Sequence, residues 1–155
     1  MTPPADRPTV LFLCTGNSCR SQMAEGWAKH LHADRLDVYS GGTHPKGLDP
    51  RAVAVMSEAG VDISGHSSDA IGDLPTNEFD LVITVCSSAH EHCPTIDGAK
   101  RIEHHGFDDP PRMAEGVCDE EEALDHYRRV RDQIRAFVET LPERVGTVTS
   151  TRADR

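Results

Sequence analysis

A cysteine and an arginine frame a short polar stretch near the N-terminus, CTGNSCRS. Cys14 ends an apolar run, and Arg20 follows six positions later. A thiolate is a strong nucleophile, and a guanidinium offers a planar fork of N–H donors that matches two oxygens of a tetrahedral oxyanion. The residues between them are mostly small or polar, so their backbone N–H groups can converge on the same anion. This stretch therefore predicts nucleophilic attack by a thiolate on a bound oxyanion.

The elements on either side would bring these groups together. Residues 8–14, PTVLFLC, form a continuous apolar run, which is typical of a strand buried on both faces. Apolar residues from Ser21 to His32 recur with helical spacing. Anions are favoured at a helix N-terminus, and the same field is expected to favour the thiolate of Cys14. The residues expected to bind the oxyanion are Thr15, Gly16, Asn17, Ser18, Cys19, Arg20 and Ser21. The alternative is a buried cysteine at a strand end beside a surface arginine.

The rest of the chain alternates strands with helices. Strands are expected at residues 8–14, 35–42, 79–86 and 99–106, and helices at 21–32, 49–60 and 120–141. Such alternation predicts an α/β fold, with a parallel sheet covered on both faces. One domain over residues 8–144 is expected, and residues 1–7 and 145–155 are expected to be flexible ends.

Composition excludes several classes of function. The chain has 155 residues and a formal net charge of −10, which disfavours nucleic acid and anionic membranes as partners. No apolar run reaches membrane-spanning length, and the first residues do not resemble a signal peptide, so a cytoplasmic location is expected. Five cysteines in a reducing compartment suggest chemistry rather than structural disulfides.

Two further cysteines lie beyond the third expected strand. Cys86 would fall at the same edge of the sheet as Cys14, and Cys93 follows seven residues later. Seven helical positions span about 10 Å, whereas a disulfide requires Cα atoms within about 7 Å. If Cys86 and Cys93 pair, the segment between them must rearrange, which predicts a redox-linked switch. The alternative is that both are packing thiols. Zinc binding by CSSAHEHC is not expected, because the spacing is unlike that of zinc sites.

Several motifs carry a family resemblance. The stretches CTGNSCRSQMAEGW, VYSGGT, VITVCSSAHEHCP and EHHGFDDPP resemble the thioredoxin-coupled arsenate reductases, which share the low-molecular-weight protein tyrosine phosphatase fold. The resemblance implies a four-stranded parallel sheet flanked by helices on both faces. It also implies that Cys14 attacks arsenate, that Cys86 and Cys93 relay the oxidation to the surface, and that Asp109 is the general acid, with Asp108 the weaker candidate.

The resemblance also implies partners. No cofactor is expected to be bound; electrons would come from reduced thioredoxin, and from NADPH through thioredoxin reductase. Arsenate would be the substrate, phosphate or sulfate would compete, and the protein would be a monomer. Polar residues expected near the loop could brace it or hold a monovalent cation: Asn17, Glu25, Ser40, Ser67 and Asp69.

Three alternatives remain at this point. A tyrosine phosphatase would need only Cys14, Arg20 and Asp109, although DDPPRM lacks the aromatic residue that such phosphatases usually carry after the Asp-Pro pair. A non-enzymatic Cys/His redox or metal sensor would bind zinc and show no turnover. A reductase that uses a small thiol and a glutaredoxin-like partner would not need both Cys86 and Cys93.

Overall fold

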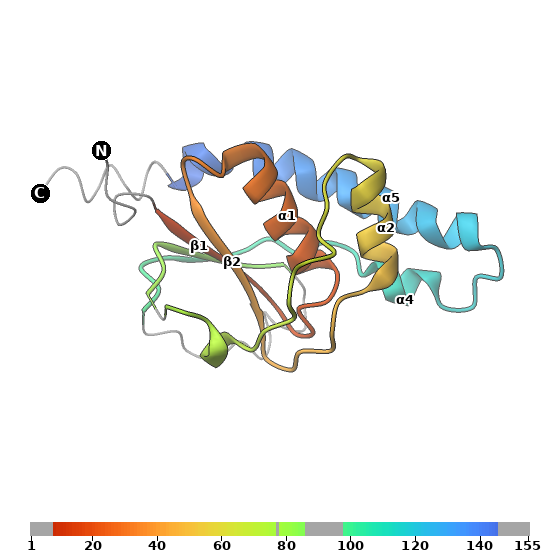
Figure 1. Ribbon diagram of the computed structural model, residues 1–155, viewed down its shortest axis with the longest axis horizontal. Helices are drawn as coiled ribbons and strands as arrows, with labels where there is room; N and C mark the ends of the chain where they lie inside the picture. The colour runs from red at the N-terminus through yellow and green to blue at the C-terminus, as the bar shows by residue number, and fades with distance from the viewer. Residues whose placement is uncertain (1–7, 77, 86–97, 146–155) are drawn as a thin grey trace, which may run out of the picture.

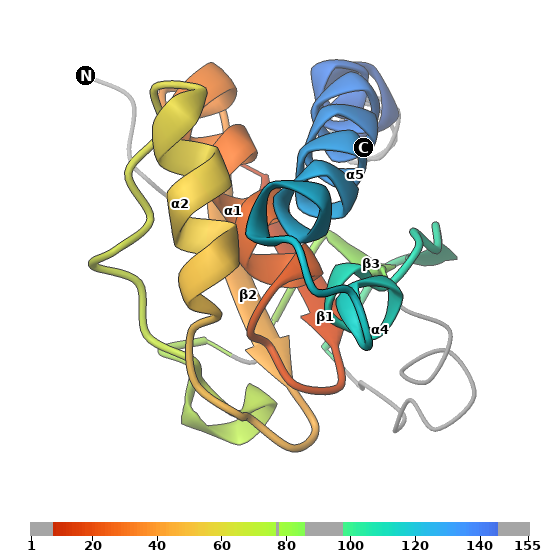
Figure 2. The same ribbon diagram turned by 90° about the vertical axis from the view of Figure 1, so that its right-hand side faces the viewer.

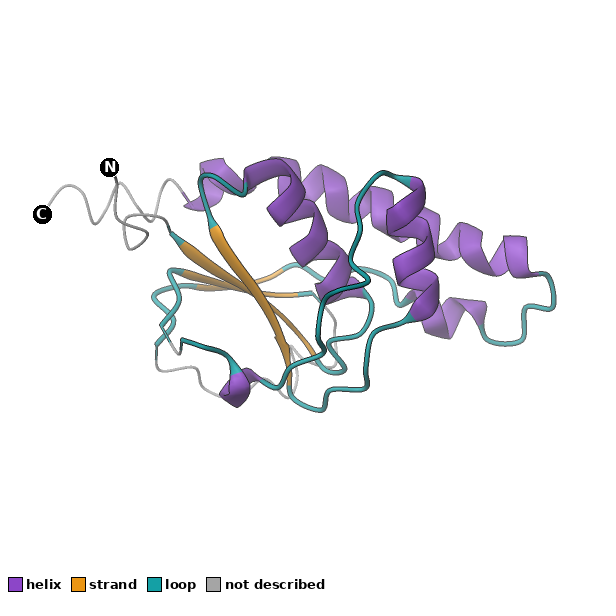
Figure 3. Ribbon diagram, in the orientation of Figure 1, coloured by secondary structure: helices purple, strands orange, loops and turns teal. Residues whose placement is uncertain are grey.

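The computed structural model describes residues 8–76, 78–85 and 98–145, and Figure 1 shows the course of the chain. The elements alternate as expected, and Figure 3 distinguishes helices from strands. Their order is β1 (Thr9–Cys14), α1 (Arg20–His32), β2 (Asp37–Gly42), α2 (Pro50–Glu58), the short 3-10 helix η2 (Ile71–Asp73), β3 (Leu81–Thr84), β4 (Ile102–His104), α4 (Pro110–Ala114) and α5 (Glu120–Glu139).

The strands form one parallel sheet in the order β2-β1-β3-β4. All side chains of β3, and those of β1 after Thr9, are buried, as expected for central strands covered on both faces. Cys14 is in register with Gly42 at the carboxyl end of the β1–β2 pair. In parallel α/β sheets this edge is where ligands bind, so the sheet places Cys14 where a substrate can reach it.

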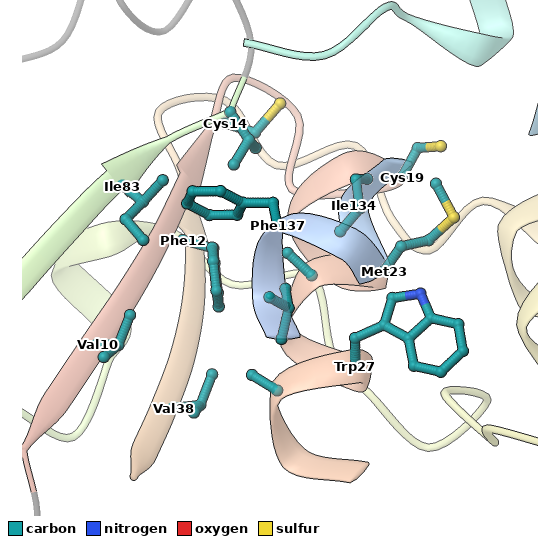
Figure 4. Close-up of a cluster of buried hydrophobic side chains, with 14 of the residues drawn as sticks. Val10, Phe12, Cys14, Cys19, Met23, Trp27, Val38, Ile83, Ile134 and Phe137 are labelled. Carbon is teal, nitrogen blue, oxygen red and sulfur yellow. The ribbon is translucent and has the colours of Figure 1, made fainter. Parts of the chain in front are cut away.

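Helices α1, α2 and α5 pack together over one face of the sheet (Figure 2). Figure 4 shows part of the core between these helices and the sheet, to which Phe12 of β1 and Phe137 of α5 both contribute. On β2, Ser40 faces α1, because its hydroxyl donates to Glu25. The next residue, Gly41, therefore faces the opposite side, against Ile71 at the start of η2. Across the described ranges, no helix is long and apolar enough to span a membrane.

The predicted α/β fold is confirmed, and local signals account for both ends of α2. Asp49 caps α2 by accepting a hydrogen bond from the Arg51 N–H at 2.9 Å, and Gly60 adopts a φ of 87° just beyond the helix. Two elements, η2 and α4, have no counterpart in the predicted order, because elements of three and five residues show no helical periodicity. The domain bounds 8–144 stay a prediction, although Val145, assigned to the flexible end, is fully buried.

Candidate active site

The loop from Cys14 to Arg20 turns its carbonyl groups outward. The carbonyls of Thr15, Gly16 and Ser18 accept hydrogen bonds of 2.8, 2.9 and 3.0 Å from backbone N–H groups of the segment 44–49. The described peptide bonds are all trans, so the N–H group that follows each of these carbonyls points the opposite way. These N–H groups are therefore directed toward the inside of the loop, which creates the predicted nest for an anion.

Asn17 holds the centre of this loop. It is fully buried and has a φ of 44°, which makes it the one non-glycine residue with positive φ in the described part of the chain. Its side chain donates to the Asp69 carbonyl at 3.1 Å and accepts from the Ser21 hydroxyl at 2.8 Å. Its own carbonyl accepts from Gln22 at 3.0 Å and from Ser68 at 2.8 Å. The Ser21 hydroxyl is thus hydrogen-bonded to the Asn17 side chain, behind the loop.

Cys14 lies at the mouth of the nest. It is the last residue of β1, its exposed fraction is 5%, and it lines the cavity described below. Figure 4 shows its sulfur at the strand end, beside the loop that leads to α1. Gly42 packs against this loop so closely that a Cβ there would lie 2.7 Å from the Thr15 carbonyl oxygen. The carboxyl ends of β1 and β2 therefore fix the position of the thiol together.

Arg20 opens α1 and reaches toward the loop that carries Asp109. One guanidinium nitrogen donates to the Phe107 carbonyl at 2.9 Å, and another lies 3.6 Å from the Asp109 carboxylate. Its Nε is buried and has no hydrogen-bond partner among the described residues, as expected of a donor that awaits an anion. Asp109 is half-exposed at the start of α4, whereas Asp108 lies 3.3 Å from Arg129. The geometry therefore favours Asp109 over Asp108 as the acid.

A cavity of about 390 Å³ brings these groups together. Cys14, Arg20 and Asp109 line it, along with Thr15, Gly16, Ser18 and Cys19. The sequence did not single out Lys46 and Asp49, which also line it. Both residues reach the cavity from the segment after β2, so no local pattern linked them to the loop. The one signal in the sequence was the helix N-cap pattern at Asp49, which does not indicate a site. Cys19 differs from Cys14 in chemistry: burial, followed by the charge of Asp49, raises the pKa of Cys19 well above its ordinary value.

The residues proposed to brace the loop lie behind it. Glu25 accepts from the Ser40 hydroxyl and pairs with Lys29, so both carboxylate oxygens are engaged. Ser67 donates to the Asp69 carboxylate at 2.9 Å. The link from this set to the loop is the hydrogen bond from the Asn17 side chain to the Asp69 carbonyl, whereas Glu25 and Ser40 bond to each other. Within the described ranges, no three His, Cys, Asp or Glu side chains lie together so as to hold a metal ion.

The remaining cysteines separate into two groups. Cys86 and Cys93 lie outside the described residues, so their predicted relay stays a prediction. Cys118, which no prediction used, is exposed in the link before α5. The nucleophile, the guanidinium and the acid are thus the parts of the predicted site that the structure brings together.

Comparisons with known proteins agree with this geometry. The family described as "Low molecular weight phosphotyrosine protein phosphatase" matches residues 9–150. Arsenate reductase 2 of Staphylococcus haemolyticus is 43% identical over 90% of this chain and 99% of its own length. Arsenate reductase of Staphylococcus aureus strain Newman is 43% identical over 89% of this chain and 98% of its own length.

Solved structures give the same result. A structure described as "An arsenate reductase in the phosphate binding state" is 36% identical, has a TM-score of 0.75, and matches 89% of this chain and 98% of its own. The thioredoxin-dependent arsenate reductase of Corynebacterium glutamicum has a TM-score of 0.64 at 23% identity, which shows a shared fold. That match covers 91% of this chain and 62% of its own.

Proposed function

The chain belongs to the low molecular weight phosphotyrosine protein phosphatase family, and from its site and its relatives we infer that it is an arsenate reductase. The observation that carries this function is the loop between β1 and α1. Its N–H groups turn inward, the Cys14 thiol lies at its mouth, and the buried Nε of Arg20 lacks a partner among the described residues. Curated relatives that are 43% identical over about nine-tenths of the chain are arsenate reductases.

The first step is attack by Cys14. Its thiolate adds to the arsenic of a bound arsenate, whose oxygens accept hydrogen bonds from the loop N–H groups and from Arg20. Asp109, 3.6 Å from the guanidinium, donates a proton to the oxygen that leaves as water. The product of this step is a thiol–arsenate adduct in which arsenic is still pentavalent.

The following steps transfer two electrons. The Cys86 thiolate attacks the Cys14 sulfur, the sulfur–arsenic bond breaks, and its electron pair stays on arsenic, which leaves as trivalent arsenite. The new Cys14–Cys86 disulfide is then attacked by Cys93, which frees Cys14 and leaves a Cys86–Cys93 disulfide. Thioredoxin reduces that disulfide and is itself regenerated by NADPH through thioredoxin reductase. This relay rests on the sequence, because Cys86 and Cys93 lie outside the described residues.

The proposal also covers the cofactor, the oligomeric state, the location and the competing anions. The enzyme needs no prosthetic group, acts as a monomer in the cytoplasm, and binds phosphate or sulfate as competitors. Asn17, Glu25, Ser40, Ser67 and Asp69 brace the loop, and a monovalent cation could join them. Such a cation would have to compete with Lys29 for the carboxylate of Glu25.

The test is arsenate-dependent NADPH oxidation in the presence of thioredoxin and thioredoxin reductase. We expect turnover in the parent and none in Cys14→Ser, Cys86→Ser or Cys93→Ser, since each cysteine forms a bond in the relay. Cys118→Ser is the matched control, because this exposed thiol has no part in the mechanism. A parent without turnover that hydrolyses an aryl phosphate through Cys14, independently of Cys86 and Cys93, would identify a phosphatase instead.

A further inference from the structure

A second acidic residue, which the proposed mechanism does not use, lines the cavity. Asp49 lines the same cavity as Cys14 and Arg20. Its backbone N–H also donates to the Ser18 carbonyl at 3.0 Å, so it belongs to the support of the loop. A carboxylate that faced a bound dianion would repel it, and this repulsion is strong in a partly buried site. The position of the Asp49 carboxylate therefore affects how well an oxyanion binds.

Both oxygens of this carboxylate are held from outside the loop. Oδ1 accepts from the Arg51 N–H at 2.9 Å, and Oδ2 accepts from the Tyr127 hydroxyl at 2.7 Å. Tyr127 belongs to α5, and only 1% of it is exposed. The Arg51 guanidinium contacts Glu120 at 2.9 and 3.1 Å. The carboxylate is thus bound toward α2 and α5.

We propose that Tyr127 is a positioning residue for the oxyanion site, whose hydroxyl keeps the Asp49 carboxylate turned away from the bound anion. This inference rests on the proposed function, because it concerns the same anion site. Without the hydroxyl, Oδ2 loses its partner and the carboxylate is free to rotate toward the cavity, where Arg20 would attract it. Asp49 would then compete with the substrate for the guanidinium.

The chemistry of Tyr127 suits this role. Burial, followed by the hydrogen bond to Asp49, raises the pKa of the Tyr127 phenol. The phenol therefore remains a protonated donor at every pH at which the enzyme would work. Neither a catalytic nor a redox step involves it, so its effect should appear in oxyanion affinity.

The test measures binding of inorganic phosphate to the fully reduced protein. Phosphate should protect Cys14 from iodoacetamide, and mass spectrometry of the Cys14 peptide gives a Kd without any turnover. The variants are Tyr127→Phe, Asp49→Asn and the double variant. Phenylalanine preserves the buried ring, and asparagine still caps a helix and can donate to the tyrosine oxygen. Thermal unfolding of each variant checks the fold.

We expect Tyr127→Phe to weaken phosphate binding at least about fivefold, and Asp49→Asn to tighten it, because an amide does not repel an anion. In the Asp49→Asn background, Tyr127→Phe should change the Kd by less than about twofold. An unchanged Kd in Tyr127→Phe, an equal loss in both backgrounds, or weaker binding in Asp49→Asn would overturn the proposal. If Tyr127→Phe does not fold, the Asp49→Asn result decides alone.

Arsenate turnover of the parent is measured in the same series. A parent that binds phosphate but does not reduce arsenate would contradict the proposed function, and the comparison of Kd values would still decide the role of Tyr127.

Discussion

Cys14 and Cys19 belong to one loop, yet their surroundings differ. Both are buried and both line the cavity, but Cys14 ends β1, whereas Cys19 precedes α1 and lies beside the charge of Asp49. Burial and the Asp49 carboxylate both disfavour a thiolate at Cys19 and raise its pKa. We therefore interpret the Cys19 side chain as a packing residue and Cys14 as the candidate nucleophile of the loop.

The raised pKa of Cys19 predicts that an alkylating reagent distinguishes between the cysteines. At about pH 7, iodoacetamide should modify Cys14 and the exposed Cys118, while Cys19 should stay unmodified because its thiol is buried and protonated. Peptide mass spectrometry measures each site, and protein unfolded in urea provides the control in which Cys19 reacts. Modification of Cys19 in the folded protein at the rate seen for Cys118 would contradict the interpretation.

At the scale of elements, the end of β2 determines the shape of the loop. A Cβ at Gly42 would lie 2.7 Å from the Thr15 carbonyl oxygen and 3.1 Å from that of Cys14, both backbone atoms. The structure can accommodate that contact only if β1 or the loop moves. A side chain introduced at position 42 would therefore displace the candidate nucleophile without touching the substrate.

Gly42→Ala should lower kcat/KM for arsenate by at least about tenfold, because small misplacements of catalytic groups cost large factors in rate. Gly65→Ala is the matched control, since a Cβ there meets no atom within 4 Å. Steady-state kinetics of both variants checks the prediction. If Gly42→Ala and Gly65→Ala have equal activity, the contact does not position the loop.

Another contact at this scale joins α2 to α5. Arg128 donates to both carboxylate oxygens of Glu58, at 2.8 and 2.9 Å, and these hydrogen bonds lower the pKa of Glu58 below its usual 4.5. A lowered pKa in the folded state means that the ionised carboxylate stabilises the fold above pH 4.5, and that this stabilisation is lost as the pH falls through the folded-state pKa.

Glu58→Gln should therefore lower Tm slightly near neutral pH, and the difference from the parent should shrink in acid. The effect should be small and should weaken in high salt, because the Glu58 side chain is 41% exposed. Thermal unfolding from about pH 7 to pH 3.5 measures it. A Tm difference between the parent and Glu58→Gln that grows as the pH falls would contradict the expected pH dependence.

At the scale of the whole molecule, the negative net charge repels the proposed substrate, which is also an anion. The formal net charge is −10, whereas the cavity gathers Arg20 and Lys46 around a nest of N–H groups. Long-range repulsion from remote acidic residues is screened when the Debye length falls from about 30 to about 10 Å, but contacts within the cavity are screened much less. Salt should therefore remove more repulsion than attraction over this range.

We expect kcat/KM for arsenate to rise, by up to about threefold, as sodium chloride increases the ionic strength from about 10 to 100 mM. Thioredoxin is held at saturation so that its own charge does not affect the result. A steady fall across the range would mean that the local cations of the cavity, rather than the net charge, control the approach of the substrate.

The sequence by itself determined the architecture and identified the candidate groups for the chemistry. Continuous apolar runs gave β1 and β3, helical periodicity gave α1 and α5, and the order of elements required a parallel sheet. Cys14 and Arg20 were predictable because the loop that links them is local in the chain, so their spacing alone brings them to one helix N-terminus.

Only the tertiary structure decided how distant segments meet. It turned the loop carbonyls outward through donors from residues 44–49, placed Asp109 rather than Asp108 near Arg20, and joined Asp49 to Tyr127 across 78 positions. Such contacts depend on how the elements pack, and no periodicity or spacing within one segment encodes them. Local interactions depend on which residues are neighbours in the sequence, whereas the surroundings of a side chain form only when the chain folds.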